Sequence, residues 1–235
     1  MTLSIFQSAA TCDLAQFSEG SVDFGVEIDL FTTRYGQHWI PRGLMDDPAT
    51  SVASVLIGGN DIIAMQQEKW GTPGPRTYAR GTVQSSATCV RNGLNKLHKL
   101  GFRRFLLLEQ PPADKGELLG STPEHAASSK AMLLEHNALM RVAALNLTKQ
   151  WNDGSTISIF PLYKLLDGMV TLQPAYEFKY GAGSYCNSTC RSPYDYVWTD
   201  SVHVSYRAFE LVANAIVRFL TGDLGAPKLF SDITD

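Results

Sequence analysis

Asp200 and His203 have the side chains in this sequence best suited to chemistry, because they form an Asp-x-x-His motif. At this spacing the carboxylate can hold one imidazole nitrogen while the other nitrogen faces a substrate. The acid of a Ser-His-Asp triad orients its histidine in this way, and the histidine then acts as general base. We expect the nearby aromatic residues Tyr194, Tyr196 and Trp198 to shield the pair from water. The alternative is that His203 begins the final helix, with Asp200 as its N-terminal cap.

A second motif, Gly58-Gly59-Asn60-Asp61, follows a compact apolar run at residues 54–57. The run is typical of a buried strand that leads into a loop. Ligands of open α/β sheets bind at the carboxyl ends of the strands, and glycines let the backbone approach a substrate closely. The Asn60 amide can donate a hydrogen bond to a developing oxyanion. The alternative is an ordinary turn, because all four residue types favour turns.

The elements that must position these motifs alternate between strand and helix. Hydrophobic patterning predicts strands at residues 2–6, 54–57, 102–108 and 156–160, and helices at residues 86–100, 129–151 and 206–220. This alternation implies parallel βαβ units, so we expect an α/β fold with a mainly parallel sheet covered by helices on both faces. Residues 69–81 are rich in Gly, Pro and Thr and predict an exposed loop. We see no domain boundary and expect one domain over residues 1–235.

Composition excludes several classes of function. The 235 residues are 44% hydrophobic and 18% charged, which is enough apolar content for a sizeable core. A net charge of −3 provides no basic field for nucleic acid or an anionic membrane surface. No apolar stretch approaches the roughly 20 residues of a membrane span, so no span is expected.

Cysteines and glycosylation sequons suggest an oxidising compartment. Cys186 and Cys190 have no histidine or carboxylate beside them, so a local disulfide is favoured over zinc ligation. Sequons at Asn146 and Asn187 are compatible with a secretory route, although no signal peptide is visible. Pairing of the other two cysteines, Cys12 and Cys89, stays open.

Taken in order, these motifs resemble the SGNH or GDSL esterase and lipase family, particularly secreted fungal and plant-type members such as carbohydrate acetylesterases. Residues 58–61 resemble the family's Gly-x-Asn-Asp block, and residues 200–203 its Asp-x-x-His block. Ser-Ala-Ala-Thr-Cys at residues 8–12 looks like its Ser-Gly-Ala-Thr-Cys block, and residues 107–112 resemble a strand before its double-proline turn. The resemblance covers essentially the whole chain and implies a three-layer α/β/α, flavodoxin-like fold.

The resemblance also implies an activity, which is acyl transfer from an ester to water. His203 would be the general base and Asp200 its orienting acid. Asn60, Gly59 and the backbone N–H of Ala9 would bind the oxyanion. The implied substrate is a small-molecule or polysaccharide ester, including acetylated carbohydrate. No metal, organic cofactor or nucleic acid is implied, and a secreted monomer is expected.

One block of the family has no counterpart here. The Gly-Asp-Ser block, which carries the nucleophile and ends the family's first strand, should precede Ser8, and only seven residues do so. We therefore expect an N-terminally truncated sequence without nucleophile or first strand. The empty place in the sheet must then be filled in another way. Ser21 is the nearest imitation of the nucleophile, but polar residues rather than a strand precede it.

Two alternatives from other classes remain. The first is a noncatalytic protein or inactive fragment that keeps a glycan- or ester-binding cleft. Trp70, Tyr78 and Trp198 are candidates to stack on sugars, or equally to anchor the core and loops. The second is a phosphoesterase metal site formed by Asp61, Asp200 and His203, although this set lacks the further ligands that a two-metal site needs.

Overall fold

The computed structural model describes residues 2–4, 23–35, 47–71 and 81–222. Within these ranges the chain has a mixed α/β fold, as expected. Its residue contacts divide it into two compact units. The first unit comprises Met1–Gln110 and Leu134–Ile159, and the second comprises Pro111–Leu133 and Phe160–Asp235.

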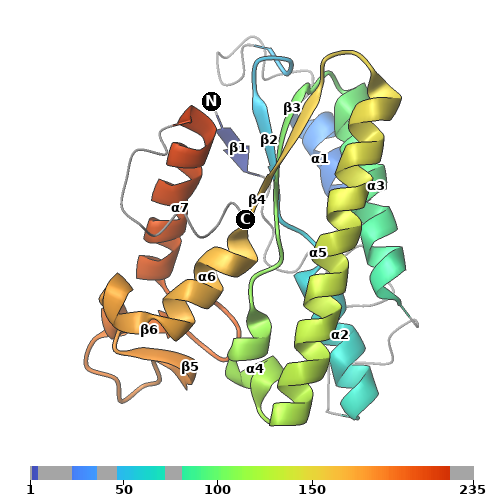
Figure 1. Ribbon diagram of the computed structural model, residues 1–235. Helices are drawn as coiled ribbons and strands as arrows, with labels where there is room; N and C mark the ends of the chain where they lie inside the picture. The colour runs from blue at the N-terminus through green and yellow to red at the C-terminus, as the bar shows by residue number, and fades with distance from the viewer. Residues whose placement is uncertain (1, 5–22, 36–46, 72–80, 223–235) are drawn as a thin grey trace. The chain divides into compact units, whose positions relative to one another are not determined.

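A four-stranded sheet forms the centre of the first unit (Figure 1). Its strands stand in the order β1 (Thr2–Ser4), β2 (Val52–Val55), β3 (Arg104–Leu108) and β4 (Thr156–Phe160). The β1–β2 and β2–β3 pairs are parallel. Strand β1 pairs with one edge of β2, and β3 pairs with the other edge. The backbone of β2 is therefore hydrogen-bonded on both sides, and no strand is missing between β1 and β2.

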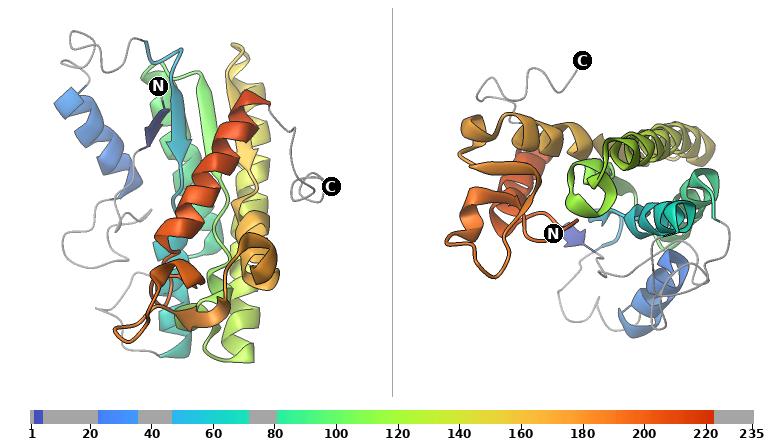
Figure 2. Two further views of the ribbon diagram at one scale, coloured as in Figure 1. Left: turned by 90° about the vertical axis from the view of Figure 1, so that its left-hand side faces the viewer. Right: turned by 90° about the horizontal axis from the view of Figure 1, so that it is seen from below.

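Helices pack on this sheet to form the core of the first unit. They are α1 (Phe24–Tyr35), α2 (Gly59–Trp70), α3 (Val83–Lys99) and the C-terminal part of α5 (Pro123–Trp151). Helix α1 packs against α3 (Figure 2). The apolar positions Val90, Leu94 and Leu97, which the sequence places at helical spacing, are at most 1% exposed. The core cluster contains Phe24, Ile28, Ala53, Val55, Ile57, Val90, Leu94, Leu97, Phe102, Phe105, Leu107, Met140 and Leu147.

The predicted helices and strands are confirmed in outline, with corrections at their ends. Helix α3 begins at a capping box between Thr82 and Ser85 and is followed by Gly101, whose φ is +104°. Patterning did not predict helices α1, α2 or α6. The motif from Gly58 was assigned to a loop, but α2 begins at Gly59. Residues 69–70, expected in the following exposed loop, are the last two residues of α2.

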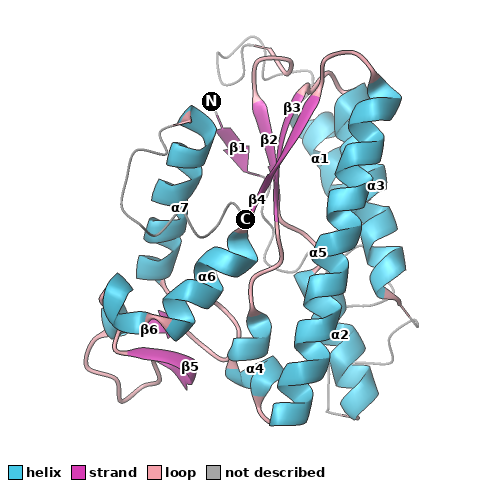
Figure 3. Cartoon of the chain, in the orientation of Figure 1, coloured by secondary structure: helices cyan, strands magenta, loops and turns pink. Residues whose placement is uncertain are grey.

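The second unit combines short helices with a two-stranded parallel sheet (Figure 3). Its elements are η3 (Ala113–Lys115), α4 (Glu117–Gly120), the N-terminal part of α5, α6 (Leu162–Thr171), η4 (Gln173–Tyr176), β5 (Tyr180–Tyr185), η5 (Pro193–Asp195), β6 (Tyr196–Trp198) and α7 (Tyr206–Thr221). A hydrogen bond of 3.1 Å from the Tyr163 hydroxyl to buried Asp114 ties α6 to η3. Gly222, in the left-handed conformation, ends α7 as predicted.

Cys186 and Cys190 are disulfide-bonded in the segment between β5 and β6, which confirms the predicted local disulfide. Cys89 on α3 is also disulfide-bonded, and Cys12 lies outside the described residues. None of the described helices is both long enough and apolar enough to cross a membrane.

Candidate functional site

The Asp200–His203 pair in the second unit has the geometry that its spacing predicts. Asp200 Oδ2 lies 2.8 Å from His203 Nδ1, and Asp200 Oδ1 accepts hydrogen bonds from the backbone N–H groups of Val202 at 2.9 Å and His203 at 2.7 Å. Partial burial tends to raise the pKa of Asp200, but these hydrogen bonds outweigh it and hold the pKa below its usual range. The carboxylate thus stays charged and fixes Nδ1. In the described part of the chain, Nε2 of His203 has no hydrogen-bond partner.

Backbone hydrogen bonds close the loop that carries this pair. The N–H of Thr199 donates to the carbonyl of His203 at 2.8 Å, just beyond an antiparallel bridge between Trp198 and Val204. Trp198 is 1% exposed, so it anchors the loop in the core. The cap of α7 is Ser205, whose side chain accepts from the N–H of Ala208 at 3.2 Å. The alternative that Asp200 caps this helix is therefore wrong.

Helix α4 also holds this loop, a contact that sequence reasoning did not predict. The N–H of Leu118 donates to the carbonyl of Ser201 at 2.9 Å. A Cβ atom at Gly116 would lie 2.7 Å from that carbonyl oxygen, so only glycine permits this approach. Residues 116 and 201 are far apart in sequence, and no local pattern indicates their contact.

The expected aromatic shield over the pair is absent. His203 and Asp200 have side-chain exposures of 66% and 46%. Tyr194 is itself 56% exposed, whereas Tyr196 stacks on Tyr180 with ring centroids 4.4 Å apart. The shielding prediction was wrong because these side chains pack on the β5–β6 sheet or point to solvent.

Two of the three aromatic residues considered for sugar stacking lie in the described residues, Trp70 in the first unit and Trp198 in the second. The burial of Trp198 excludes it from that role. Trp70 on α2 donates to the Gln66 side chain at 2.7 Å, and the Lys69 ammonium lies 4.9 Å from its ring centroid. Tyr78 lies outside the described residues. The anchoring interpretation is therefore the better one for Trp70 and Trp198.

The glycine motif lies in the first unit and opens α2. Gly58 has φ +108° and ψ −8°, which reverses the chain between β2 and the helix. Gly59 and Asn60 occupy the first helical turn and are half-buried, and Asp61 is 1% exposed. N–H groups of a first turn have no acceptor within the helix and lie at the positive end of its dipole. This arrangement favours a negatively charged group and suits an oxyanion.

Four buried polar side chains, Ser86, Gln110, His136 and Asn137, support this turn, and we call them the loop-support cluster. The Gln110 amide donates to the carbonyl of Ile57 at 2.6 Å. In turn, the N–H of Gln110 donates to Asn137 Oδ1 at 2.7 Å. A Cβ at Gly58 would lie 2.6 Å from His136 Nε2, so the imidazole packs directly against the turn.

His136 is the most deeply buried member of the loop-support cluster. It is 0% exposed, and burial lowers its pKa to about 4, so it is neutral at pH 7. Its Nε2 lies 3.2 Å from Ser86 Oγ, while Nδ1 has no hydrogen-bond partner among the described residues. Because Ser86 is only 2% exposed, a substrate cannot reach this serine–histidine pair. We conclude that the pair positions the turn and is no nucleophile with its base.

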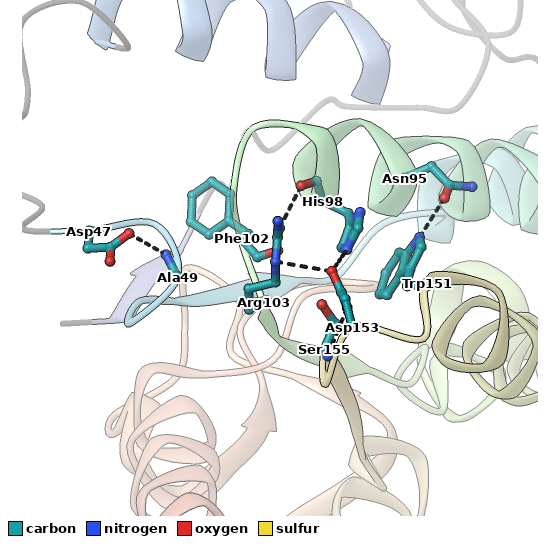
Figure 4. A network of polar contacts seen from close by, with 9 residues as sticks. All are labelled: Asp47, Ala49, Asn95, His98, Phe102, Arg103, Trp151, Asp153 and Ser155. Carbon is teal, nitrogen blue, oxygen red and sulfur yellow. Dashed lines mark hydrogen bonds and ion pairs between the residues drawn. The ribbon is translucent and has the colours of Figure 1, made fainter.

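A second polar network lies at the amino ends of β3 and β4 (Figure 4). Asp153 Oδ2 lies 2.8 Å from His98 Nε2 and 3.2 Å from Arg103 Nε. Hydrogen bonding by Ser155, then by His98, holds the pKa of Asp153 well below its usual range. The His98 ring stacks on Trp151, with centroids 4.2 Å apart. We call these residues the surface network; it joins α3 to the α5–β4 connection.

The remaining predicted site residues have separate outcomes. Ala9 and Ser21 lie outside the described residues. Within the described ranges, no group of three or more His, Cys, Asp and Glu side chains is arranged to hold a metal ion. Asp61 belongs to the first unit, and Asp200 and His203 belong to the second.

Comparison with known proteins adds no assignment. No model of a known protein family matches the chain, and no curated protein sequence matches it significantly.

Proposed function

We propose that this chain belongs to an ester hydrolase that uses a Ser-His-Asp mechanism, as its resemblance to the SGNH or GDSL family implies. The observation that carries the proposal is the Asp200–His203 pair. Its carboxylate holds Nδ1 at 2.8 Å, receives two backbone hydrogen bonds and leaves Nε2 available. This is the arrangement in which an imidazole acts as general base.

In the proposed mechanism, His203 Nε2 takes the proton of a serine hydroxyl as the serine oxygen attacks an ester carbonyl. The resulting imidazolium returns a proton to the leaving alcohol, and the same cycle with water releases the acid. Asp200 stabilises the imidazolium and fixes the tautomer. The resemblance also implies an oxyanion hole, to which Asn60 would contribute.

The wider frame of the proposal also comes from the resemblance. We propose a three-layer α/β/α, flavodoxin-like fold and a protein that is secreted as a monomer. The proposed substrate is an ester of a carbohydrate or of another small molecule. The mixed α/β fold and the parallel pairing of β1, β2 and β3 support this frame. No described serine of the second unit is hydrogen-bonded to His203, whose ring pairs with Asp200.

The experiment that tests the proposal is hydrolysis of p-nitrophenyl acetate by the full chain, compared with His203→Ala and Asp200→Asn. Loss of a positioned general base typically lowers the rate about 10²–10⁴-fold. His125→Ala is the matched control, since the Nδ1 of His125 lies 2.9 Å from Ser121 Oγ. Equal rates in the wild type, His203→Ala and His125→Ala would reject ester hydrolysis by this chain.

A second experiment separates the enzyme from its noncatalytic alternative. A fluorophosphonate probe labels an activated serine covalently, and peptide mass spectrometry then identifies the residue. Labelling of one serine that falls in His203→Ala would support the enzyme. No labelling, together with calorimetrically measurable binding of an acetylated oligosaccharide, would favour a protein that keeps only a binding cleft.

A further inference from the structure

The segment between β5 and β6 encloses a complete glycosylation sequon within a disulfide ring. Asn187, Ser188 and Thr189 stand between Cys186 and Cys190, whose bond spans a sequence separation of 4. All three sequon residues are exposed. In an oxidising secretory compartment, disulfide formation and N-glycosylation would therefore act on the same five residues.

The closed ring folds the sequon onto itself. Asn187 Oδ1 accepts hydrogen bonds from the N–H of Thr189 at 3.0 Å and from the Thr189 hydroxyl at 2.7 Å. The N–H of Cys190 donates to the carbonyl of Asn187 at 3.0 Å and completes a tight turn. In the described part of the chain, Asn187 Nδ2 has no hydrogen-bond partner. The acceptor nitrogen is thus open to solvent, whereas the threonine hydroxyl is engaged by its own asparagine.

The second sequon provides a contrast because it lies within α5. Asn146 is exposed, but the hydroxyl of Thr148 donates to the carbonyls of Ala144 and Leu145, both at 3.1 Å. Residues two apart on a helix point to different sides. A transferase that must contact the asparagine and the threonine together cannot do so while this helix is folded.

We propose that Asn187 is an N-glycosylation site that accepts its glycan mainly while the Cys186–Cys190 ring is open, and that closing the disulfide lowers its reactivity. An open loop frees the Thr189 hydroxyl for the transferase and lets the backbone leave the turn. In the closed loop the Thr189 hydroxyl stays hydrogen-bonded to Asn187, and the backbone stays in the turn. An attached glycan is compatible with later closure, because Asn187 is exposed and its Nδ2 makes no hydrogen bond within the described residues.

The glycan transfer and the ring closure both use co-reactants that a secretory compartment contains. Asn187 Nδ2 attacks the anomeric carbon of a lipid-linked oligosaccharide, a C–N bond forms, and the C–O bond to polyprenyl pyrophosphate breaks. The pyrophosphate leaves with the bonding electrons, and the amide proton passes to a base of the transferase. Ring closure then removes two protons and two electrons from the thiols of Cys186 and Cys190, which reduce the disulfide of an oxidoreductase.

The test uses folded, unglycosylated full-length chain incubated with oligosaccharyltransferase and a lipid-linked oligosaccharide, with site occupancy read by peptide mass spectrometry. We compare the wild type with Cys186→Ser/Cys190→Ser, which cannot close the ring. Freeing one hydrogen bond corresponds to about 3–10-fold, so we expect initial modification of Asn187 to rise by that factor in the double variant. Asn146 should stay unmodified in both proteins and thereby reports an intact α5.

Two further measurements keep the test decisive. Should the double variant not fold, mild reduction of the Cys186–Cys190 bond in the wild type opens the same ring. Asn187→Gln should remove the modification entirely. An unmodified Asn187 in the open form would overturn the glycosylation site. Equal modification of Asn187 in open and closed forms would overturn the control by the disulfide, and glycan on Asn146 would overturn the contrast between the two sequons.

Discussion

The loop-support cluster and the surface network lie in the same unit, and each contains a histidine from a helix, yet they use opposite chemistry. His136 is 0% exposed, and in the described part of the chain its ring is hydrogen-bonded to the neutral Ser86 side chain. His98 has a side-chain exposure of 17%, and its partner Asp153 also pairs with Arg103. The cluster supports the turn after β2, while the network joins the ends of elements near the surface. The buried histidine therefore has a neutral hydrogen-bond partner, and the more exposed histidine has a charged one.

The physical reason is the free energy of removing charge from water. An ionised group in a low-dielectric interior is stable only when it is paired and hydrogen-bonded, so a buried histidine loses its proton instead. This accounts for the pKa of about 4 at His136. In the surface network, solvent remains in contact with the charges, and ion pairs form without that penalty but contribute little.

The largest effect that we expect is at the turn supported by the cluster. Gly58→Ala forces a side chain into φ +108° and against His136 and Ser86, with Cβ contacts of 2.6 Å and 3.0 Å. Positive φ and overpacking together should lower the free energy of unfolding by about 3 kcal/mol, measured by urea denaturation. Gly71→Ala is the matched control, since its φ is +60° and no atom of the described residues lies within 4 Å of the new Cβ. It should lose about 1 kcal/mol, and equal losses would refute tight packing at the turn.

The next effect concerns the pH dependence that His136 imposes. Because its folded pKa of about 4 lies below the unfolded value of 6.5, the unfolded chain binds more protons between these values. Stability should therefore rise with pH over this window, by up to about 3 kcal/mol from this group. His136→Gln removes that contribution, so the difference in unfolding free energy between wild type and variant should change with pH from 4 to 6.5. A constant difference would show that His136 does not titrate differently in the two states.

Glu27 on α1 offers a test with the opposite sign. It is 6% exposed, and burial, assisted by Asp23, raises its pKa from 4.5 to about 7. The folded chain then binds more protons between these values, so this group lowers stability as pH rises through the window. Glu27→Gln should stabilise the protein above pH 7 by about 2 kcal/mol and have little effect near pH 4. Destabilisation at pH 8 would indicate that the charged carboxylate has a favourable role.

The smallest effect should come from the surface network. Asp153→Asn removes the charge that pairs with His98 and Arg103 but keeps an acceptor for the N–H of Ser155. Since the Asp153 pKa is lowered in the folded state, its contribution is present at neutral pH and is lost in acid. We expect a smaller loss in urea denaturation than for Gly58→Ala, and one that shrinks in 1 M salt. A loss as large as that of Gly58→Ala, unchanged by salt, would erase the distinction between the two regions.

Sequence patterning predicted the elements whose signals are local and strong. Periodic apolar residues indicated α3, α5 and α7, and β-branched or apolar runs indicated β2, β3 and β4. Helix α2 was missed because it opens with Gly59 and Asn60, which favour turns and have weak helix propensity. In the fold, the turn at Gly58 is held by groups from distant segments, and tertiary contacts override local preference.

The same division applies to the candidate site. By itself the sequence determined the Asp200–His203 pair and the Cys186–Cys190 disulfide, because three or four residues of chain bring those atoms within reach whatever surrounds them. Only the tertiary structure decided that α4 holds the loop at Ser201 and that Ser86 meets His136, 50 residues away in sequence. Such contacts depend on how strands and helices pack, and their free energy comes from burial that no short segment can provide alone.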